Sequence, residues 1–286
     1  MARLYIVSTP IGNLEDTTHR AVRVLGTVDR VLAEDTRRTA ILLRHYGVET
    51  PLVSLHAFNE AARVERILDW LNAGDDLAIV SDAGTPLLSD PGARIVQHVV
   101  SAGHDAVPVP GPSAVLAALV ASGVDPEPFT FYGFTPRVGG DRSRRLDEIA
   151  AMPHATVLFE APNRLVRLLR DLEERCGPER RIVVARELTK VHETFWRGTL
   201  GRAVAYYEKE TPRGECTIVL AGAGEDHAAI DAAETEAARL LARSLLDQGS
   251  RTSAVARELA RRLGVPRNRA YDIALSVARE REGDER

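Results

Sequence analysis

The sequence has little cysteine and no long hydrophobic run. Cys176 and Cys216 are its two cysteines, and neither lies near a C-x-x-C motif or a Cys/His cluster. This spacing indicates reduced thiols and no metal site. No stretch approaches the roughly 20 apolar residues of a membrane span, and the start MARLYIVSTP has too short an apolar run for a secretory signal. We therefore expect a metal-free cytoplasmic protein without a membrane segment.

The sequence also lacks a large excess of positive or negative charge. The formal net charge of the 286 residues is −4, so the whole molecule exerts no general attraction on a polyanion. A surface for nucleic acid must then be a local basic patch. Hydrophobic residues make up 44% of the sequence, enough to form buried hydrophobic cores. A length of 286 residues predicts two or three domains.

Short apolar runs alternate with longer helical patterns in the first block, which is typical of βα units around a largely parallel sheet. The predicted strands are 4–8, 30–33, 52–55, 77–81 and 106–109. The predicted helices between them are 17–25, 36–46, 60–72 and 93–102.

Two further blocks follow. Strands are predicted at 129–132, 156–159, 182–185, 194–196 and 217–220, with helices at 164–175 and 202–208. Their short connections favour a mixed sheet. Three last helices, 234–246, 253–263 and 268–280, fit either a helix-turn-helix or a plain helical hairpin. The expected fold is two α/β domains, 1–120 and 121–224, plus a small helical domain at 232–286.

Three loops of the first block stand out, because open α/β sheets bind ligands where their strands end. The loop at 8–16 contains Gly12 but lacks G-x-G-x-x-G and G-x-x-x-x-G-K-[ST]. Neither a dinucleotide nor a nucleoside triphosphate site is therefore indicated. The loop SDAGTPLLSDPG at 81–92 is too rich in glycine and proline for the interior of a helix or strand. It predicts a rigid backbone that presents amide groups to a ligand.

Polar side chains accompany these loops. Asp82 directly follows its strand and is a candidate acceptor for a ligand amine or hydroxyl, whereas Asp90 is a candidate helix cap. A third loop, PGPSA at 110–114, opens a helix that Ser113 would cap. Ordinary tight turns and a capped helix are the alternative interpretation of all three loops.

Taken in order, these motifs resemble the ribosomal RNA small-subunit methyltransferase I group of the tetrapyrrole (class III) methylases. The matching runs are TPIGNLED at 9–16, EDTRRTAILLRHYG at 34–47, SDAGTPLLSDPG at 81–92, PGPSA at 110–114, FYGFTPR at 131–137, FEAPNR at 159–164, ARELTKVHE at 185–193 and RGECTIVLAG at 213–222. The resemblance covers residues 1–224, and the C-terminal helices are similar to a block that many members carry.

The resemblance implies a homodimeric enzyme that transfers the methyl group of S-adenosylmethionine (SAM). The implied acceptor is the 2′-hydroxyl of cytidine 1402 of 16S rRNA in the small ribosomal subunit, and SAM would lie between the two α/β domains. The implied cofactor contacts are Pro10, Gly12, Asp82, Ala83, Gly84, Thr85, Ser113 and Ala114, with Phe159, Glu160, Arg186, Glu187 and Thr217 from the later motifs.

Methyl transfer from a sulfonium is an in-line displacement, so alignment of the acceptor oxygen is the main task. A ribose hydroxyl is a weak nucleophile near neutral pH, and a base or a cation beside it would help. The candidates are Lys190, Glu187 and Glu193 in one segment and Glu160 in another. Ordinary surface ion pairs are the alternative for all four.

Arginines gather in three parts of the sequence and predict contacts with RNA phosphates. The candidates are Arg137, Arg142, Arg144, Arg145, Arg164, Arg261, Arg267 and Arg269. The first four surround a glycine-containing loop that we expect to fold over substrate. Solvated faces compensated by carboxylates are the alternative interpretation.

Two other functions deserve comparison. A small-molecule methylase of the same fold would not need the basic helical block. A ligand-sensing regulator would read DNA through the C-terminal helices, but the segment DIAL at 272–275 offers mostly apolar or acidic side chains to base edges. The sequence therefore favours the RNA methyltransferase.

Overall fold

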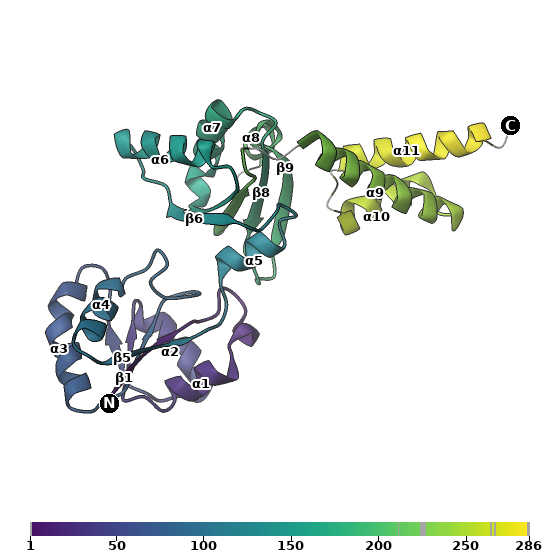
Figure 1. Cartoon of the computed structure of the whole chain (residues 1–286). Coiled ribbons are helices and arrows are strands. Elements are labelled where there is room, and N and C mark those ends of the chain that lie inside the picture. The colour runs from purple at the N-terminus through teal and green to yellow at the C-terminus, as the bar shows by residue number, and fades with distance from the viewer. Residues whose placement is uncertain (1, 211, 224–226, 264, 266, 285–286) are drawn as a thin grey trace. The chain divides into compact units, whose positions relative to one another are not determined.

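The computed structural model describes residues 2–210, 212–223, 227–263, 265 and 267–284. The chain forms two compact units (Figure 1). The first contains Met1–Ala121 together with the short segment Glu187–Glu193, and the second contains Ser122–Arg186 and Thr194–Arg286.

The first unit is built on a parallel sheet of five strands. The strands are β1 (Arg3–Val7), β2 (Arg30–Ala33), β3 (Leu52–Ser54), β4 (Leu77–Val80) and β5 (Asp105–Val109), in the order β3-β2-β4-β1-β5. All four neighbouring pairs are parallel, as the βα pattern of the sequence predicts.

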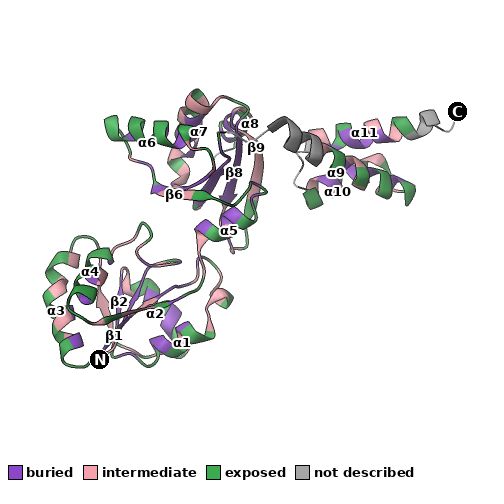
Figure 2. Cartoon of the chain, viewed as in Figure 1, coloured by how far each residue is buried: buried purple, intermediate pink, exposed green. Residues whose placement is uncertain are grey.

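Helices cover both faces of this sheet, because its strands are apolar on both sides (Figure 2). On one face α1 (His19–Leu25) and α2 (Thr36–His45) pack over Val7, Val31 and Val80. On the other, α3 (Glu60–Asn72) and α4 (Ala93–Ser101) pack over Leu4, Leu32 and Ile79. The 3-10 helix η1 (Leu14–Asp16) and α5 (Ala114–Val120) complete the unit.

The strand order brings the three predicted ligand loops together. The chain leaves β1 towards β2 on one side and leaves β4 towards β5 on the other, while β4, β1 and β5 lie next to one another. In parallel sheets, ligands bind at the carboxyl ends of such strands, where the connections diverge. The loops after β1, β4 and β5 therefore emerge at one edge.

The second unit contains a mixed sheet of five strands. These are β6 (Phe129–Phe134), β7 (Ala155–Glu160), β8 (Arg181–Arg186), β9 (Thr194–Thr199) and β10 (Cys216–Leu220), in the order β6-β7-β10-β8-β9. The β6–β7 pair is parallel and the other three pairs are antiparallel. The helices α6 (Gly140–Ala151), α7 (Pro162–Cys176) and α8 (Leu200–Tyr207) share one core with the sheet and cover one of its faces.

Three C-terminal helices form a core of their own, which confirms the predicted helical block. They are α9 (His227–Asp247), α10 (Thr252–Leu263) and α11 (Arg267–Asp284). Their contacts are made by small and branched apolar side chains, among them Ala242, Val255, Leu259 and Ala274.

One helix was not predicted. The sequence indicates a glycine-containing loop at 138–140 and no element in the residues that follow, but Gly140–Ala151 is the helix α6. Its apolar positions Leu146 and Ile149 are buried against the core of the second unit. The remaining α/β architecture agrees with the predicted fold class. Within the described residues, no helix is long and apolar enough to cross a membrane.

Candidate cofactor site and RNA surface

Hydrogen bonds join the loops after β1, β4 and β5. Thr9 and Gly84 form a two-way backbone bridge with N–O distances of 2.9 and 3.0 Å. The Ser8 hydroxyl donates to Thr85 Oγ1 at 3.2 Å, and Thr85 Oγ1 donates to the carbonyl of Pro112 at 3.2 Å. The three loops that the sequence singles out thus form one continuous surface of the first unit.

The loop at 81–92 has an unusual backbone. Gly84 and Gly92 have φ angles of 82° and 118°, and the non-glycine residues Leu87 and Ser89 both have φ of 72°. Such angles are rare for residues with a Cβ and persist where the surrounding structure holds them. A Cβ on Gly92 would lie 2.4 Å from Ile79 Cδ1 and 2.7 Å from Leu87 Cδ2, so these side chains would have to move to accept one. The loop is therefore a fixed, irregular backbone.

The predicted cofactor residues of the first unit line this surface in different ways. Gly12 and Ala83 are exposed. Asp82 Oδ1 accepts a hydrogen bond from the Asp35 amide at 3.0 Å, and its other oxygen lies 3.4 Å from Arg38. Ser113 is the N-cap of α5, as predicted, and Ala114 begins that helix.

Two further carboxylates lie near Asp82: Asp90, for which the sequence suggested a capping role, and Glu34, which the sequence did not single out as a site residue. Burial raises the pKa of Asp90 to about 6, with the nearby charges of Glu34 and Asp82 adding to the effect. Burial and the charge of Asp82 likewise raise the pKa of Glu34. Glu34 directly follows β2, which is the signal that could have identified it. Among the residues described, no group of three or more His, Cys, Asp or Glu side chains could hold a metal ion.

Asp90 does not cap the following helix, contrary to one expectation. The N-cap of α4 is Gly92, which has no side chain for the purpose. Instead Glu60 Oε1 accepts hydrogen bonds from the amides of Gly92 and Arg94, at 3.1 and 2.9 Å. A side chain from α3 therefore fulfils the role, which sequence spacing does not reveal.

Three of the four candidate catalytic residues belong to the segment Glu187–Glu193, which packs with the first unit. Lys190 Nζ lies 3.0 Å from Glu187 Oε1, and Glu193 Oε2 accepts from the Thr189 amide at 2.6 Å. The segment touches the first loop so closely that a Cβ on Gly12 would lie 2.4 Å from Lys190 Cγ. The structure thus brings these residues to the predicted cofactor loops.

The fourth candidate, Glu160, lies in the second unit and is 2% exposed. Its carboxylate is 3.1 Å from Arg164 Nε and accepts from the Thr135 hydroxyl at 3.1 Å. Thr135 Oγ1 also accepts from the buried Arg142 at 2.9 Å. Glu160 is therefore part of a network that joins the end of β7 to α6, to α7 and to Thr135, which directly follows β6.

The cofactor candidates of the second unit divide between the two faces of its sheet. Phe159 and Thr217 are directly paired across β7 and β10, so they share the face opposite the helices. Glu160 and Arg186 lie on the helix-covered face, since they alternate with these positions. Phe159 packs between aromatic rings, with its centroid 5.0 Å from that of Phe131.

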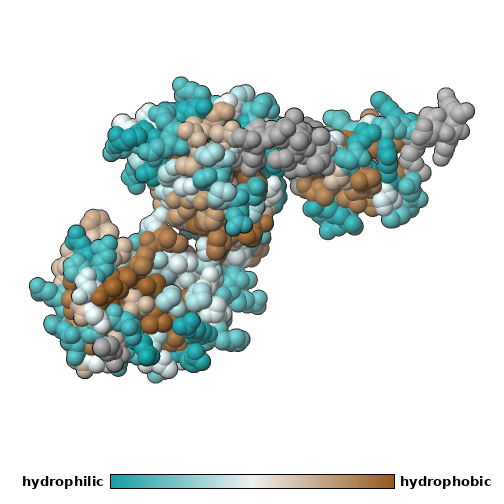
Figure 3. Space-filling model, in the orientation of Figure 1, coloured by the Kyte–Doolittle hydropathy of each residue, from teal (hydrophilic) through white to brown (hydrophobic). Residues whose placement is uncertain are grey.

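The predicted RNA contacts differ in accessibility. Arg137 is exposed, and the surface over α6 is hydrophilic (Figure 3). Arg142 is 5% exposed and donates to Asp171 at 2.6 Å, which removes it from the candidate RNA surface. The remaining candidates with described side chains each have a partner: Arg144 with Asp141, Arg145 with Glu148, Arg164 with Glu160, Arg261 with Glu258 and Arg269 with Thr235. The side chain of Arg267 lies outside the described residues.

Comparisons with known proteins agree with this arrangement. The family model of the tetrapyrrole (corrin/porphyrin) methylases matches residues 3–204. The chain is 44% identical to a ribosomal RNA small subunit methyltransferase I of Synechocystis sp., over 97% of this chain and 99% of that protein. A protein of the same name from Thermotoga maritima is 46% identical over 78% of this chain and 99% of that protein.

A solved structure shows the same fold. The methyltransferase CobJ matches with a TM-score of 0.61 and 19% identity, over 78% of this chain and 95% of that one. At this identity the likeness concerns the fold alone. The family model, in contrast, spans most of the chain and includes all three loops. The chain belongs to the tetrapyrrole methylase family.

Proposed function

We propose that the chain is a SAM-dependent methyltransferase of the small ribosomal subunit, which methylates the 2′-hydroxyl of cytidine 1402 of 16S rRNA. The observation that carries this proposal is the 44% identity, over nearly the full length of both chains, to a relative named ribosomal RNA small subunit methyltransferase I. The specific nucleotide and hydroxyl come from the resemblance of the sequence motifs.

The first unit has features suited to SAM. The Thr189 hydroxyl is buried without a hydrogen-bond partner among the described residues, and it lies beside Gly12, where a Cβ would be only 2.9 Å from it. A polar ligand at this position would satisfy that hydroxyl. The residues proposed to hold SAM here are Pro10, Gly12, Asp82, Ala83, Gly84, Thr85, Ser113 and Ala114. Bound SAM supplies a methyl group on a sulfonium.

The second unit contributes fewer candidates. Phe159 and Thr217 stay in the proposed cofactor set, because they share the sheet face opposite α6, α7 and α8. Glu160 is committed to its contacts with Arg164 and Thr135, and Arg186 donates to a backbone carbonyl at 3.0 Å. We propose positioning roles for these two residues rather than contact with the reacting atoms.

The segment Glu187–Glu193 supplies the proposed acid–base groups. Glu187 holds Lys190 in place by their ion pair at 3.0 Å. An ammonium so fixed would stabilise negative charge on the acceptor oxygen, and Glu187 or Glu193 would accept the hydroxyl proton. The exposed Arg137 and the C-terminal Arg261, Arg267 and Arg269 are proposed to contact RNA phosphates. The active form is proposed to be a cytoplasmic homodimer.

The test is incorporation of labelled methyl groups from SAM into small ribosomal subunits, followed by mapping of ribose methylation in 16S rRNA. A single 2′-O-methyl group on cytidine 1402 is the expected result. SAM binding without any transfer to subunits or naked rRNA would contradict the proposal and indicate a small-molecule acceptor for the same fold.

A further inference from the structure

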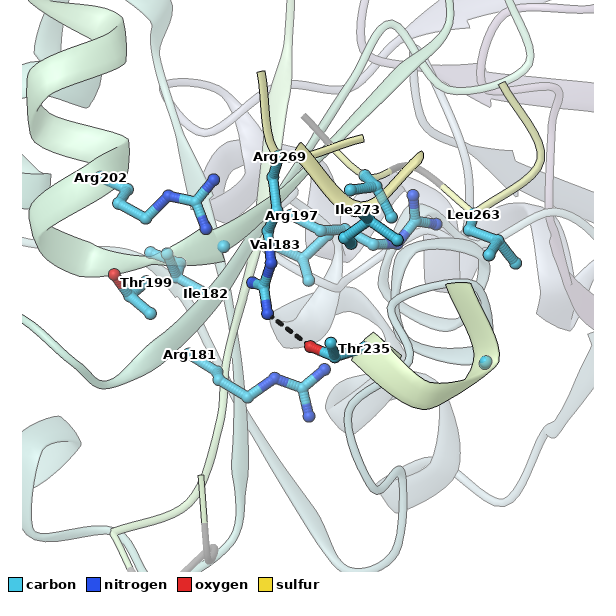
Figure 4. Close-up of a pocket in the computed structure, with 13 residues that line it drawn as sticks. Arg181, Ile182, Val183, Arg197, Thr199, Arg202, Thr235, Leu263, Arg269 and Ile273 are labelled. Atoms are coloured by element: carbon cyan, nitrogen blue, oxygen red, sulfur yellow. Dashed lines mark hydrogen bonds between the residues drawn. The ribbon is translucent and has the colours of Figure 1, made fainter. Parts of the chain in front are cut away.

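Four arginines line one pocket of the second unit (Figure 4). They come from four different elements, which are distant in sequence. These are β8, β9, α8 and α11, and they supply Arg181, Arg197, Arg202 and Arg269. The hydroxyl residues Thr199 and Thr235 also line the pocket. Of these residues, the sequence patterns had drawn attention to Arg269 alone.

Hydrogen bonds within the unit hold the guanidinium groups in position. Arg181 and Arg197 donate to the backbone carbonyls of residues 122–123, at 3.3 and 3.2 Å. Arg269 donates to Thr235 Oγ1 at 2.7 Å, as drawn in Figure 4. A guanidinium carries five N–H donors, so a group that is anchored in this way can also donate to a ligand. The pocket is thus partly organised before any ligand arrives.

Size and charge define the class of ligand. The cavity measures about 150 Å³, below the roughly 300–1,000 Å³ of pockets for drug-sized molecules. It therefore accommodates one compact group rather than a whole nucleotide. Four of the described lining residues are arginines, and their guanidinium groups make the pocket rich in N–H donors. Converging guanidinium groups recognise oxyanions, phosphate above all, through paired hydrogen bonds.

We propose that this pocket binds a backbone phosphate of the RNA substrate. The inference rests on the proposed function, since an enzyme that modifies rRNA meets phosphates along its whole contact surface. A phosphate seated between β8, β9 and α11 would be held by the second sheet and by the C-terminal helices at once. The helical block would then contribute to RNA affinity through a defined pocket, without reading sequence.

Arg202 is the residue to change in a test. It is exposed, and no hydrogen bond or ion pair of its side chain occurs among the described residues, so its removal leaves the fold intact. The matched control is Arg262, an exposed arginine of α10 that lies outside the pocket and pairs with Glu258 at 2.7 Å. Arg202→Gln and Arg262→Gln each remove one positive charge from the same unit.

Binding of an RNA fragment that carries the acceptor cytidine is measured by fluorescence anisotropy at several salt concentrations. We expect Arg202→Gln to raise Kd about tenfold, because one charge-assisted contact is lost. The slope of log Kd against log salt should fall by about 0.7–0.9, the value for one phosphate contact. Arg262→Gln should leave both quantities near those of the unmodified protein.

Two outcomes overturn the proposal. One is equal RNA binding by the Arg202→Gln and Arg262→Gln proteins. The other is thermal stabilisation by inorganic phosphate that Arg202→Gln abolishes while RNA binding stays unchanged, which would make the pocket a site for a small free anion. Methyl transfer by the unmodified protein is assayed separately. If the unmodified protein transfers methyl groups but either of these two outcomes is found, only the proposed phosphate pocket is rejected. If the unmodified protein binds RNA in an Arg202-dependent way but transfers no methyl group, only the proposed function is rejected.

Discussion

At the scale of single residues, the carboxylates beside the loop at 81–92 show how position changes chemistry. Asp35 is the N-cap of α2, where hydrogen bonds from Arg37 lower its pKa to about 2. Asp90 is half-buried near Glu34 and Asp82, and its pKa is raised to about 6. The two aspartates therefore affect stability in opposite directions as pH changes.

Asp90→Asn should make the protein more stable at pH 7.5. An aspartate in the unfolded chain titrates near 3.9, so the native state favours protonated Asp90 between that pH and about 6. Its stabilising contribution is complete below about pH 4 and is lost as pH rises through about 6. Asparagine imitates the protonated form. We expect a gain of about 1–2 kcal/mol at pH 7.5, allowing for partial solvent exposure.

Urea denaturation of both proteins between pH 4 and 8 measures this effect. The difference in unfolding free energy should vanish near pH 4 and reach its full size above pH 7. Asp35→Asn is the control, because its lowered pKa predicts no gain in the same range. A constant difference at all pH values would show that Asp90 acts through packing instead of ionisation.

Secondary structure elements followed from the sequence wherever apolar periodicity was strong. The helix expected at 60–72 is Glu60–Asn72, and the strand expected at 30–33 is Arg30–Ala33. Helix α6 was missed because its interval begins with glycine and carries few apolar residues. Tertiary contacts decide its structure: Arg142 on its first turns binds Thr135 Oγ1 and Asp171. Such a long-range pair leaves no periodic signal in the sequence.

Arg142→Met should destabilise the second unit by about 2–3 kcal/mol. The substitution removes a buried charge and leaves the Asp171 carboxylate without its guanidinium partner, and Thr135 Oγ1 loses one of its hydrogen bonds. Arg144→Met is the matched control on the same helix. Its ion pair with Asp141 is exposed on both sides, so its loss should cost less than about 1 kcal/mol.

Fluorescence can follow this unit separately. The chain has two tryptophans, and Trp196 packs against the core of the second unit, whereas Trp70 packs in the first. In a Trp70→Phe background, urea denaturation therefore reports on the second unit. Equal midpoints for Arg142→Met and Arg144→Met would contradict a structural role for the buried network.

At the scale of the whole molecule, the path of the chain is the feature that sequence could not provide. The segment Glu187–Glu193 connects β8 and β9 of the second unit, yet it packs with the first. The three loops after parallel strands were predictable, because strand ends and glycine-rich turns are local signals. The approach of Lys190 to Gly12 spans most of the chain and depends on packing alone.

A double-mutant cycle tests this approach. Gly12→Ala places a Cβ 2.4 Å from Lys190 Cγ and 2.9 Å from the carbonyl of Leu188, so it should cost about 1–3 kcal/mol of stability. Lys190→Ala removes Lys190 Cγ, the nearer of these two atoms. The double variant should then be more stable than the sum of the single changes predicts, by at least about 0.5 kcal/mol.

Gly103→Ala combined with Lys190→Ala provides the control cycle. A Cβ on Gly103 meets nothing within 4 Å, so the strain that alanine suffers at its φ of 84° does not involve Lys190. Its two changes should be additive within about 0.5 kcal/mol. Calorimetric titration with SAM gives a second measurement: Gly12→Ala should weaken binding, and Lys190→Ala should restore part of it if displacement of the segment is the cause. Strict additivity at Gly12 would mean that the segment Glu187–Glu193 does not lie against the first loop in solution. The proposed acid–base groups would then lose their connection with the cofactor site.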